Sequence, residues 1–189
     1  MLLLLPKFRS PLPFSSVRHY HYDVEKLFEG VISGKRSSLS KAITLVESTR
    51  ADHLILSKDL ISKCTQYMST RPRARRIGFT GTPGVGKSSF IEAFGKFLIE
   101  KNHKLAVLAV DPSSSRSGGS LLGDKTRMQY LSVSDSAYVR PSPNGGCMGG
   151  VSRNTIESII LSEAAGFDTI FVETVGVGQS EFMVADMVD

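Results

Sequence analysis

The chain has 189 residues, of which 41% are hydrophobic and 22% are charged, and this composition is sufficient for one substantial core. The formal net charge is +5, but seven of the basic residues lie within residues 1–22 or the run Arg71–Arg76, and the remaining chain is slightly acidic. We expect neither a nucleic-acid nor a membrane partner, because basic residues do not spread along the folded part and no apolar run approaches the ~20 residues of a bilayer span.

Residues 1–22 contain no Asp or Glu, include Lys and Arg, and carry several serines. This composition is typical of an organelle transit peptide and indicates mitochondrial targeting. A secretory signal is one alternative, but the apolar run ends at Pro6 and falls short of the ~7–15 apolar residues that such signals use. An unstructured tail is the other alternative.

Residues 23–72 form an N-terminal segment in which apolar residues recur at three- and four-residue spacing. This period predicts helices, since residues three and four apart share one helix face. We expect packing helices around Val24–Val31, Leu39–Val46 and Ala51–Met68. The run Arg71–Arg76 that follows is predicted to be a solvated linker leading into the first strand.

Residues 73–189 change to a pattern in which short apolar runs alternate with helical segments. This alternation predicts an α/β fold, a parallel sheet flanked by helices on both faces. The glycine-rich stretch Arg140–Thr155 is predicted to be a loop that leads into a helix. The expected strands are Arg76–Thr80, Leu105–Val110 and Asp168–Val172, and the expected helices are Ser88–Glu100 and Val151–Ala165.

The stretch directly after the first predicted strand has the spacing of a phosphate-binding loop, which defines a P-loop nucleotide-hydrolase fold. Gly81 and Gly86 are separated by four residues and followed by Lys87 and Ser88, where a helix begins. Glycines let main-chain N–H groups point inward, and the helix N-terminus adds about half a positive charge. We expect a polyphosphate here, with Lys87 as a catalytic group on the terminal phosphates and Ser88 as a ligand of Mg²⁺. The predicted cofactor-binding residues of the loop are Gly81, Thr82, Pro83, Gly84, Val85, Gly86, Lys87, Ser88 and Ser89.

Three carboxylates are candidates for the same site. Asp111 and Glu173 each follow a predicted strand, and Asp124 lies in the stretch Gly118–Met128. Mg²⁺ takes oxygen ligands, so we predict a metal site made of these three acids and Ser88. We also predict that Asp111 and Glu173 are catalytic residues together with Lys87. The alternatives are a turn cap for Asp111, a solvated helix for Asp124 and a surface carboxylate for Glu173.

The stretch Glu173–Gly176 resembles the strand-end acid and glycine with which nucleotide-hydrolysing switch proteins sense the γ-phosphate. Gly176 would let a main-chain N–H approach that phosphate, so the segment could order with a triphosphate and relax after hydrolysis. Small signalling GTPases place a glutamine directly after this glycine, whereas this chain has Val177. Hydrolysis must be organised differently or be slow, and Gln179 is a candidate substitute.

Several stretches together resemble the MeaB/ArgK-type family of P-loop GTPases, which has bacterial and mitochondrial members. The phosphate loop alone is shared by very many proteins, and the other stretches make the resemblance specific. They are AITLVEST (Ala42–Thr49), GFTGTPGVGKSSFIEAFG (Gly78–Gly95), LAVLAVDPSS (Leu105–Ser114), SGGSLLGDKTRM (Ser117–Met128), RPSP (Arg140–Pro143) and ETVGVGQSEF (Glu173–Phe182).

The resemblance implies a GTPase that uses GTP and Mg²⁺, escorts adenosylcobalamin onto methylmalonyl-CoA mutase and protects that enzyme. Adenosylcobalamin would be reached only through the partner enzyme. A homodimer of the full-length form and a location in the mitochondrial matrix are also implied. The nucleotide and magnesium residues that it assigns are Lys87, Ser88, Asp111, Asp124 and Glu173.

The sequence departs from this family in one respect. Such GTPases read guanine with an Asn-Lys-x-Asp stretch, which this chain lacks, and the family's C-terminal dimerisation region is also missing. We interpret the sequence as a fragment or a truncated form. If it is instead the whole protein, we expect the strand Asp168–Val172 to lack its neighbour and to lie at an unpaired sheet edge. Two functions are alternatives to the GTPase that the resemblance implies. One is an ATP-dependent kinase or transport ATPase, and the other is a nucleotide-binding module without activity.

Overall fold

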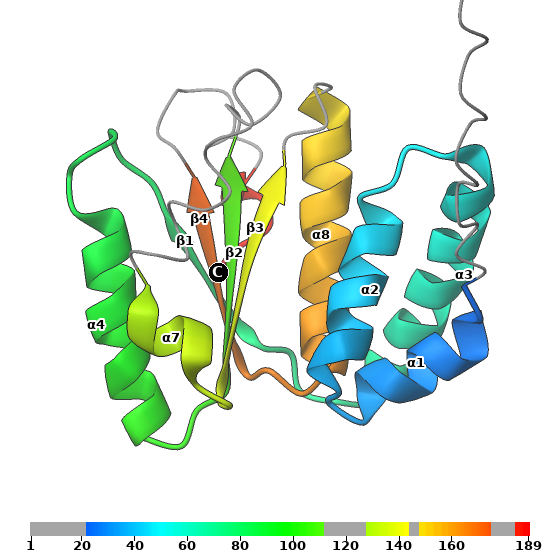
Figure 1. Ribbon diagram of the computed structural model, residues 1–189, viewed down its shortest axis with the longest axis horizontal. Helices are drawn as coiled ribbons and strands as arrows, with labels where there is room; N and C mark the ends of the chain where they lie inside the picture. The colour runs from blue at the N-terminus through cyan, green and yellow to red at the C-terminus, as the bar shows by residue number, and fades with distance from the viewer. Residues whose placement is uncertain (1–21, 112–127, 144–147, 175–183) are drawn as a thin grey trace, which may run out of the picture.

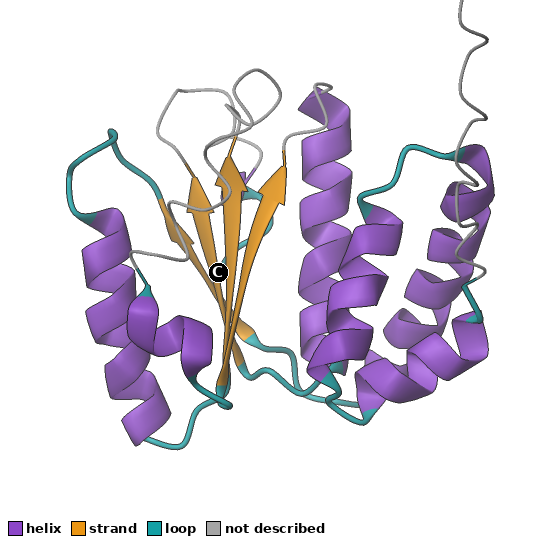
Figure 2. Cartoon of the chain, viewed as in Figure 1, coloured by secondary structure: helices purple, strands orange, loops and turns teal. Residues whose placement is uncertain are grey.

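The computed structural model describes residues 22–111, 128–143, 148–174 and 184–189. A parallel β-sheet lies between helices that cover both of its faces, with further helices outside them (Figures 1 and 2). The predicted α/β class is therefore confirmed. None of the described helices combines the length and apolar character needed to cross a bilayer.

Among the described residues, the sheet consists of four parallel strands: β1 (Arg75–Phe79), β2 (Leu105–Asp111), β3 (Ala137–Pro143) and β4 (Thr169–Thr174). Their order across the sheet is β1-β4-β2-β3. The last of the described strands, β4, thus lies inside the sheet, with β1 on one side and β2 on the other. The prediction of an unpaired edge at Asp168–Val172 is therefore wrong, because strand order depends on crossover connections that local sequence does not record.

The central strands are apolar on both faces, as a sheet covered on both sides requires. In β2, Leu105 and Val107 pack toward one face, while Ala106 and Leu108 pack toward the other. All six residues of β4 are buried. Two separate cores result, one on each face of the sheet.

Helices α4 (Lys87–Glu100) and α7 (Gln129–Val133) cover one face, and α8 (Met148–Ala164) covers the other (Figure 1). On the first face, Ile91 and Leu131 join the fully buried Phe171 of β4. On the second face, Ile159 of α8 packs with β2 and β4. Both faces of the sheet are thereby covered by helices that alternate with its strands along the chain.

The three predicted N-terminal helices are confirmed as α1 (Val24–Ile32), α2 (Arg36–Val46) and α3 (Ala51–Met68). The Asp23 carboxylate accepts a hydrogen bond of 3.1 Å from the Lys26 N–H and so caps the start of α1. Their apolar faces share one core with Leu161 of α8 and Tyr138 of β3. The helical segment therefore packs directly on the sheet domain.

Two sequence predictions need correction in this region. The stretch Arg140–Thr155 is not a loop throughout, because Arg140–Pro143 belongs to β3 and α8 already begins at Met148. The run Arg71–Arg76 is not wholly a solvated linker either. Its last residue, Arg76, donates two hydrogen bonds, of 3.0 and 2.9 Å, to the buried Glu163 carboxylate of α8.

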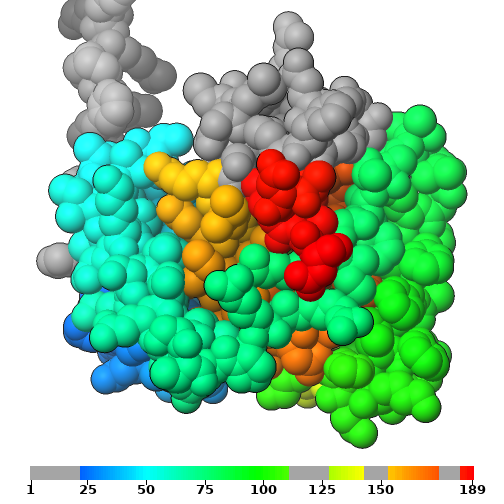
Figure 3. Space-filling view, turned by 180° about the vertical axis from the view of Figure 1, so that it is seen from behind, coloured from blue at the N-terminus to red at the C-terminus, as the bar shows by residue number. Residues whose placement is uncertain are grey.

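The segment 184–189 lies against the side of β1 that faces away from β4. The Asp189 N–H donates to the Arg76 carbonyl at 3.0 Å, and the Arg76 N–H donates to the Asp189 carboxylate at 2.9 Å. Val184 and Met187 of the same segment pack into the core beneath α8. Figure 3 shows these residues in red, lying between α8 and the green surface of the β1–α4 region.

Candidate nucleotide-binding site

The loop between β1 and α4 has a backbone that glycine makes possible. Gly84 has a φ of 82° and Gly86 a φ of 97°, in the left-handed region that other L-residues rarely adopt. A Cβ built at either position meets no atom within 4 Å, so the backbone angle rather than crowding requires glycine there. Helix α4 begins directly after Gly86, which is its N-cap residue.

The N-terminus of α4 is suited to an anion. Gly86 offers no side chain to cap the helix, and the first turn carries no acidic residue. The first N–H groups of the helix have no intrahelical acceptor, and the helix dipole places about half a positive charge there. A phosphate group matches both features.

Lys87 is held across the loop that precedes it. Its ammonium group donates to the Gly81 carbonyl at 2.5 Å and to the Thr82 carbonyl at 3.1 Å. The positive charge is thereby kept at the loop, beside the N-terminus of α4. A cation in this position complements an anion bound by the loop.

Ser88 and Glu173 meet at the same end of the sheet. The Ser88 hydroxyl donates to the Glu173 carboxylate at 3.1 Å, although 85 residues separate them in sequence. Glu173 is in register with Phe79 of β1 and Ala109 of β2, and only 8% of its surface is exposed. The reading of Glu173 as a surface carboxylate is therefore wrong.

The oxygen atoms of this pair fit a magnesium ion. A hydroxyl and a carboxylate are ligand types that Mg²⁺ takes. Within the part of the chain that the structure describes, no group of three or more His, Cys, Asp or Glu side chains gathers as a separate metal site. Mg²⁺ takes octahedral coordination by oxygen, so further ligands such as water and the phosphates would be needed besides Ser88 and Glu173.

The backbone places Asp111 at the same edge. Strand β2 ends at Asp111, whose predecessor Val110 is in register with Thr174 of β4. The carboxyl ends of β1, β2 and β4 thus lie together at one edge of the sheet, where ligands bind in parallel sheets. Three other residues singled out in the sequence, Asp124, Gly176 and Gln179, lie outside the described residues.

Glu92 was not identified from the sequence as part of this region. Its carboxylate accepts hydrogen bonds from the Tyr130 N–H at 2.6 Å and the Leu131 N–H at 3.4 Å. Helix α4, which carries Lys87, therefore also caps the start of α7. The only local sign of this role in the sequence is that Glu92 is an acid within the otherwise apolar stretch from Phe90 to Phe94. Its partners lie 38 and 39 residues further along the chain, so local sequence does not indicate them.

An aromatic cluster supports α4 from the sheet side. Phe79 packs edge-on against Phe171 at 4.8 Å between ring centroids, and Phe94 stacks on Phe171 at 5.5 Å. Phe171 is fully buried between these two rings. Helix α4 is thereby packed against β1 and β4.

Comparison with known proteins gives a consistent result. A family model described as methylmalonyl Co-A mutase-associated GTPase MeaB matches residues 39–189. A putative GTPase of Caulobacter vibrioides is 58% identical over 167 residues, which are 88% of this chain and 50% of that protein. The mitochondrial methylmalonic aciduria type A homolog of Mus musculus is 53% identical over 173 residues, which are 88% of this chain and 42% of that protein.

A solved structure shows the same fold. It is a LAO/AO transport system kinase, with a TM-score of 0.70 and 41% sequence identity, and the match covers 87% of this chain and 47% of that one. The chain spans about half the length of the curated relatives that it matches. At this TM-score and coverage, the two chains share the same overall fold.

Proposed function

Because the chain belongs to the MeaB family of methylmalonyl-CoA mutase-associated GTPases, we propose that it binds GTP and Mg²⁺ at the loop Gly81–Ser89 and hydrolyses the nucleotide. The observation that carries this proposal is the meeting of three features at one sheet edge. They are the glycine loop before α4, the Lys87 ammonium held at that loop, and the Ser88 hydroxyl bonded to the buried Glu173 carboxylate.

The roles of the loop residues follow from their chemistry. Main-chain N–H groups of the loop and of the first turn of α4 bind the β- and γ-phosphates. Lys87 turns from the loop carbonyls to the terminal phosphates and stabilises the negative charge that develops as the γ-phosphate leaves. The Gly176 N–H is the proposed contact that reports the presence of the γ-phosphate.

Ser88, Asp111, Asp124 and Glu173 are the residues that would hold the metal. When bound, Mg²⁺ supplies positive charge that one lysine cannot provide for a triphosphate. Glu173 and Asp111 would act in catalysis by holding this metal, because they lie at the carboxyl ends of β4 and β2, beside the loop. The Ser88–Glu173 hydrogen bond orients the two side chains toward one another in advance.

We assign the nucleotide cycle to the control of a partner enzyme. The family description names methylmalonyl-CoA mutase, and the proposed task is to load adenosylcobalamin onto that enzyme and protect it. Coupling of ~1–3 kcal/mol between a nucleotide site and a partner surface is enough for such control.

The test is capture of purified methylmalonyl-CoA mutase by this chain. Capture should be stronger with a non-hydrolysable GTP analogue than with GDP. Equal capture in both nucleotide states, or no capture in either, would remove the assignment of a partner. GTP binding by the chain alone, measured in the same preparation, reports the nucleotide proposal separately.

A second candidate function is suggested by the solved structure, whose title names a transport system kinase. It requires an acceptor pocket and predicts a preference for ATP. Titration of the chain with GTP, ATP and ITP separates the possibilities, because a site that hydrogen-bonds one base can reject another by ~10⁴-fold. A preference of about tenfold or more for GTP supports the GTPase, while weak and equal affinities indicate a binding module without activity.

We also propose a location in the mitochondrial matrix. The supporting observations are the acid-free composition of residues 1–22 and the word mitochondrial in the names of the mouse and Caenorhabditis elegans relatives. Fusion of residues 1–22 to a fluorescent reporter should direct it to the matrix. A reporter that stays in the cytosol or enters the secretory pathway would contradict this proposal.

A further inference from the structure

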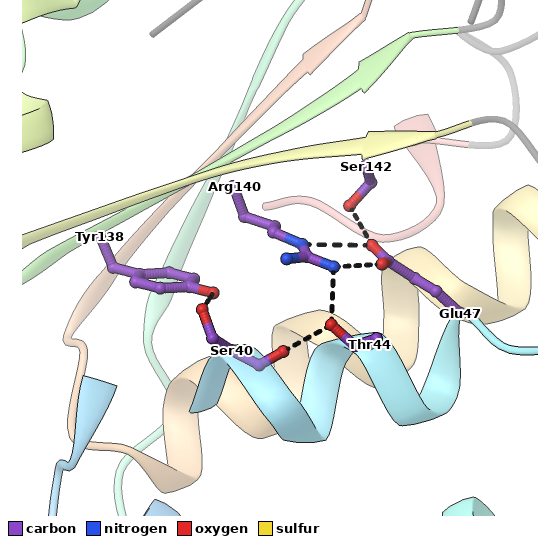
Figure 4. A network of polar contacts seen from close by, with 6 residues as sticks. All are labelled: Ser40, Thr44, Glu47, Tyr138, Arg140 and Ser142. Carbon is purple, nitrogen blue, oxygen red and sulfur yellow. Dashed lines mark hydrogen bonds and ion pairs between the residues drawn. The ribbon is translucent and has the colours of Figure 1, made fainter. Parts of the chain in front are cut away.

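Two stretches that marked the family resemblance, AITLVEST and RPSP, meet each other in the fold. The first ends α2 and the second ends β3, and their side chains form one polar network (Figure 4). None of these residues belongs to the phosphate loop. The network therefore needs an explanation of its own.

Helix α2 and strand β3 are joined along matching rows of side chains. Tyr138, Arg140 and Ser142 lie on the same face of β3, because alternate residues of a strand share a face. At the start of the row, the Tyr138 hydroxyl lies 3.1 Å from the Ser40 hydroxyl. Further along, the Arg140 guanidinium donates to the Thr44 hydroxyl at 3.2 Å.

Glu47, which follows the last residue of α2, is the centre of the network. Its carboxylate accepts a hydrogen bond from Arg140 Nε at 3.4 Å, a second from Arg140 Nη2, and a third from the Ser142 hydroxyl at 2.8 Å. Only 10% of the Glu47 side chain and 21% of the Arg140 side chain are exposed. A charge-assisted pair shielded in this way holds its geometry more firmly than a surface pair.

The network lies at the end of the sheet that carries the nucleotide site. Contacts advance from Ser40 to Glu47 as β3 advances from Tyr138 to Ser142, so helix and strand run toward the same edge. Ser142 is in register with Val110, and Pro143 is in register with Asp111. In the described part of the chain, β3 pairs with β2 alone. The side chains of α2 contact those on one face of β3 (Figure 4).

We propose that Glu47 is a positioning residue for the magnesium-nucleotide site. It fixes the carboxyl end of β3, and through the β2–β3 ladder it fixes the end of β2 at Asp111. The N-terminal helical segment thereby contributes to nucleotide binding without touching the nucleotide. This inference rests on the proposed function, because it assigns the effect to the Mg²⁺ site described there.

Glu47→Gln tests the inference, since it removes the charge and keeps the shape. The Mg²⁺ concentration for half-maximal binding of a fluorescent GTP analogue should rise about three- to tenfold in this variant. Ser142→Ala should raise it less, and the double variant should be non-additive, because both changes break one network. An unchanged Mg²⁺ midpoint together with a lowered Tm would mean a structural role only and would overturn the proposal.

Glu163→Gln provides the matched control. Glu163 also pairs with an arginine in a shielded position, but its partner Arg76 lies near the start of β1, away from the site. This variant should lower Tm and leave the Mg²⁺ midpoint unchanged, whereas an equal midpoint shift in both variants would contradict a specific role for Glu47. If the unaltered chain binds no nucleotide, the proposed function fails. Amide hydrogen exchange at residues 108–111 then decides the positioning role, with faster exchange in Glu47→Gln supporting it and unchanged exchange overturning it.

Discussion

The Ser88 hydroxyl donates a 3.1 Å hydrogen bond to the Glu173 carboxylate, which joins the first turn of α4 to the carboxyl end of β4. The two residues are 85 positions apart in sequence and approach each other only because β4 pairs directly with β1. This contact brings a hydroxyl and a buried carboxylate to the loop that carries Lys87.

Glu173→Gln should raise the Mg²⁺ concentration needed for half-maximal GTP hydrolysis by about tenfold, since loss of a metal-site group typically costs ten- to a hundredfold in metal affinity. Ser88→Ala should act in the same direction. Glu100→Gln, which changes an exposed acid at the far end of the same helix, should have no effect. A flat magnesium dependence in Glu173→Gln would show that this carboxylate does not serve the metal.

Gly86→Ala should weaken nucleotide binding and lower the free energy of unfolding by about 1–2 kcal/mol, because alanine is strained at a φ of 97°. Gly166→Ala is the matched control, since Gly166 has a φ of 87° and equally open surroundings at the end of α8. Both variants should lose similar stability, measured by urea unfolding. Only Gly86→Ala should lose affinity for GTP, and equal affinities would argue against a binding role for the loop.

Arg76→Ala should destabilise the fold by about 3 kcal/mol, because it leaves the buried Glu163 carboxylate without its cationic partner. Asp52→Ala breaks the exposed Arg50–Asp52 pair and should leave the thermal midpoint unchanged. Differential scanning calorimetry of both variants measures the difference. Similar thermal midpoints for the two variants would show that the Arg76–Glu163 pair stabilises the fold no more than the exposed pair does.

Cys64 should resist thiol reagents in the folded protein. Burial raises the pKa of its thiol to about 12, so at pH 8 only about one thiol in ten thousand is ionised. In a Cys147→Ser background, Ellman's reagent should modify Cys64 slowly at pH 8 and rapidly after addition of guanidinium chloride. Rapid modification without denaturant would mean that the core around α3 opens readily.

Much of the fold could be predicted because its signals are local. The loop from Gly81 to Ser88 is recognisable from spacing alone, and the three N-terminal helices follow from their apolar period. Strand β3 was missed because Pro141 and Pro143 interrupt it, and proline is depleted in strands. Proline is tolerated in outer strands, where fewer ladder hydrogen bonds are required, and among the described strands β3 has this position.

The remaining features depend on long-range pairing that a single sequence does not record. Glu47 and Arg140 are 93 residues apart, and neither stands in a motif whose spacing indicates its partner. The interior place of β4 likewise follows from crossover connections rather than from its own residues. Sequence could therefore identify the phosphate loop and propose its acids, but not show that Glu173 is buried beside Ser88.

The central claim is that the loop before α4 is the active site of a GTPase, and single-turnover hydrolysis by Lys87→Ala tests it most directly. Removal of one preorganised charge should slow GTP hydrolysis by about 10²–10³-fold, whereas Lys101→Ala at the other end of α4 should match the unaltered chain. Hydrolysis at the same rate in Lys87→Ala and the unaltered chain would show that the reaction takes place elsewhere.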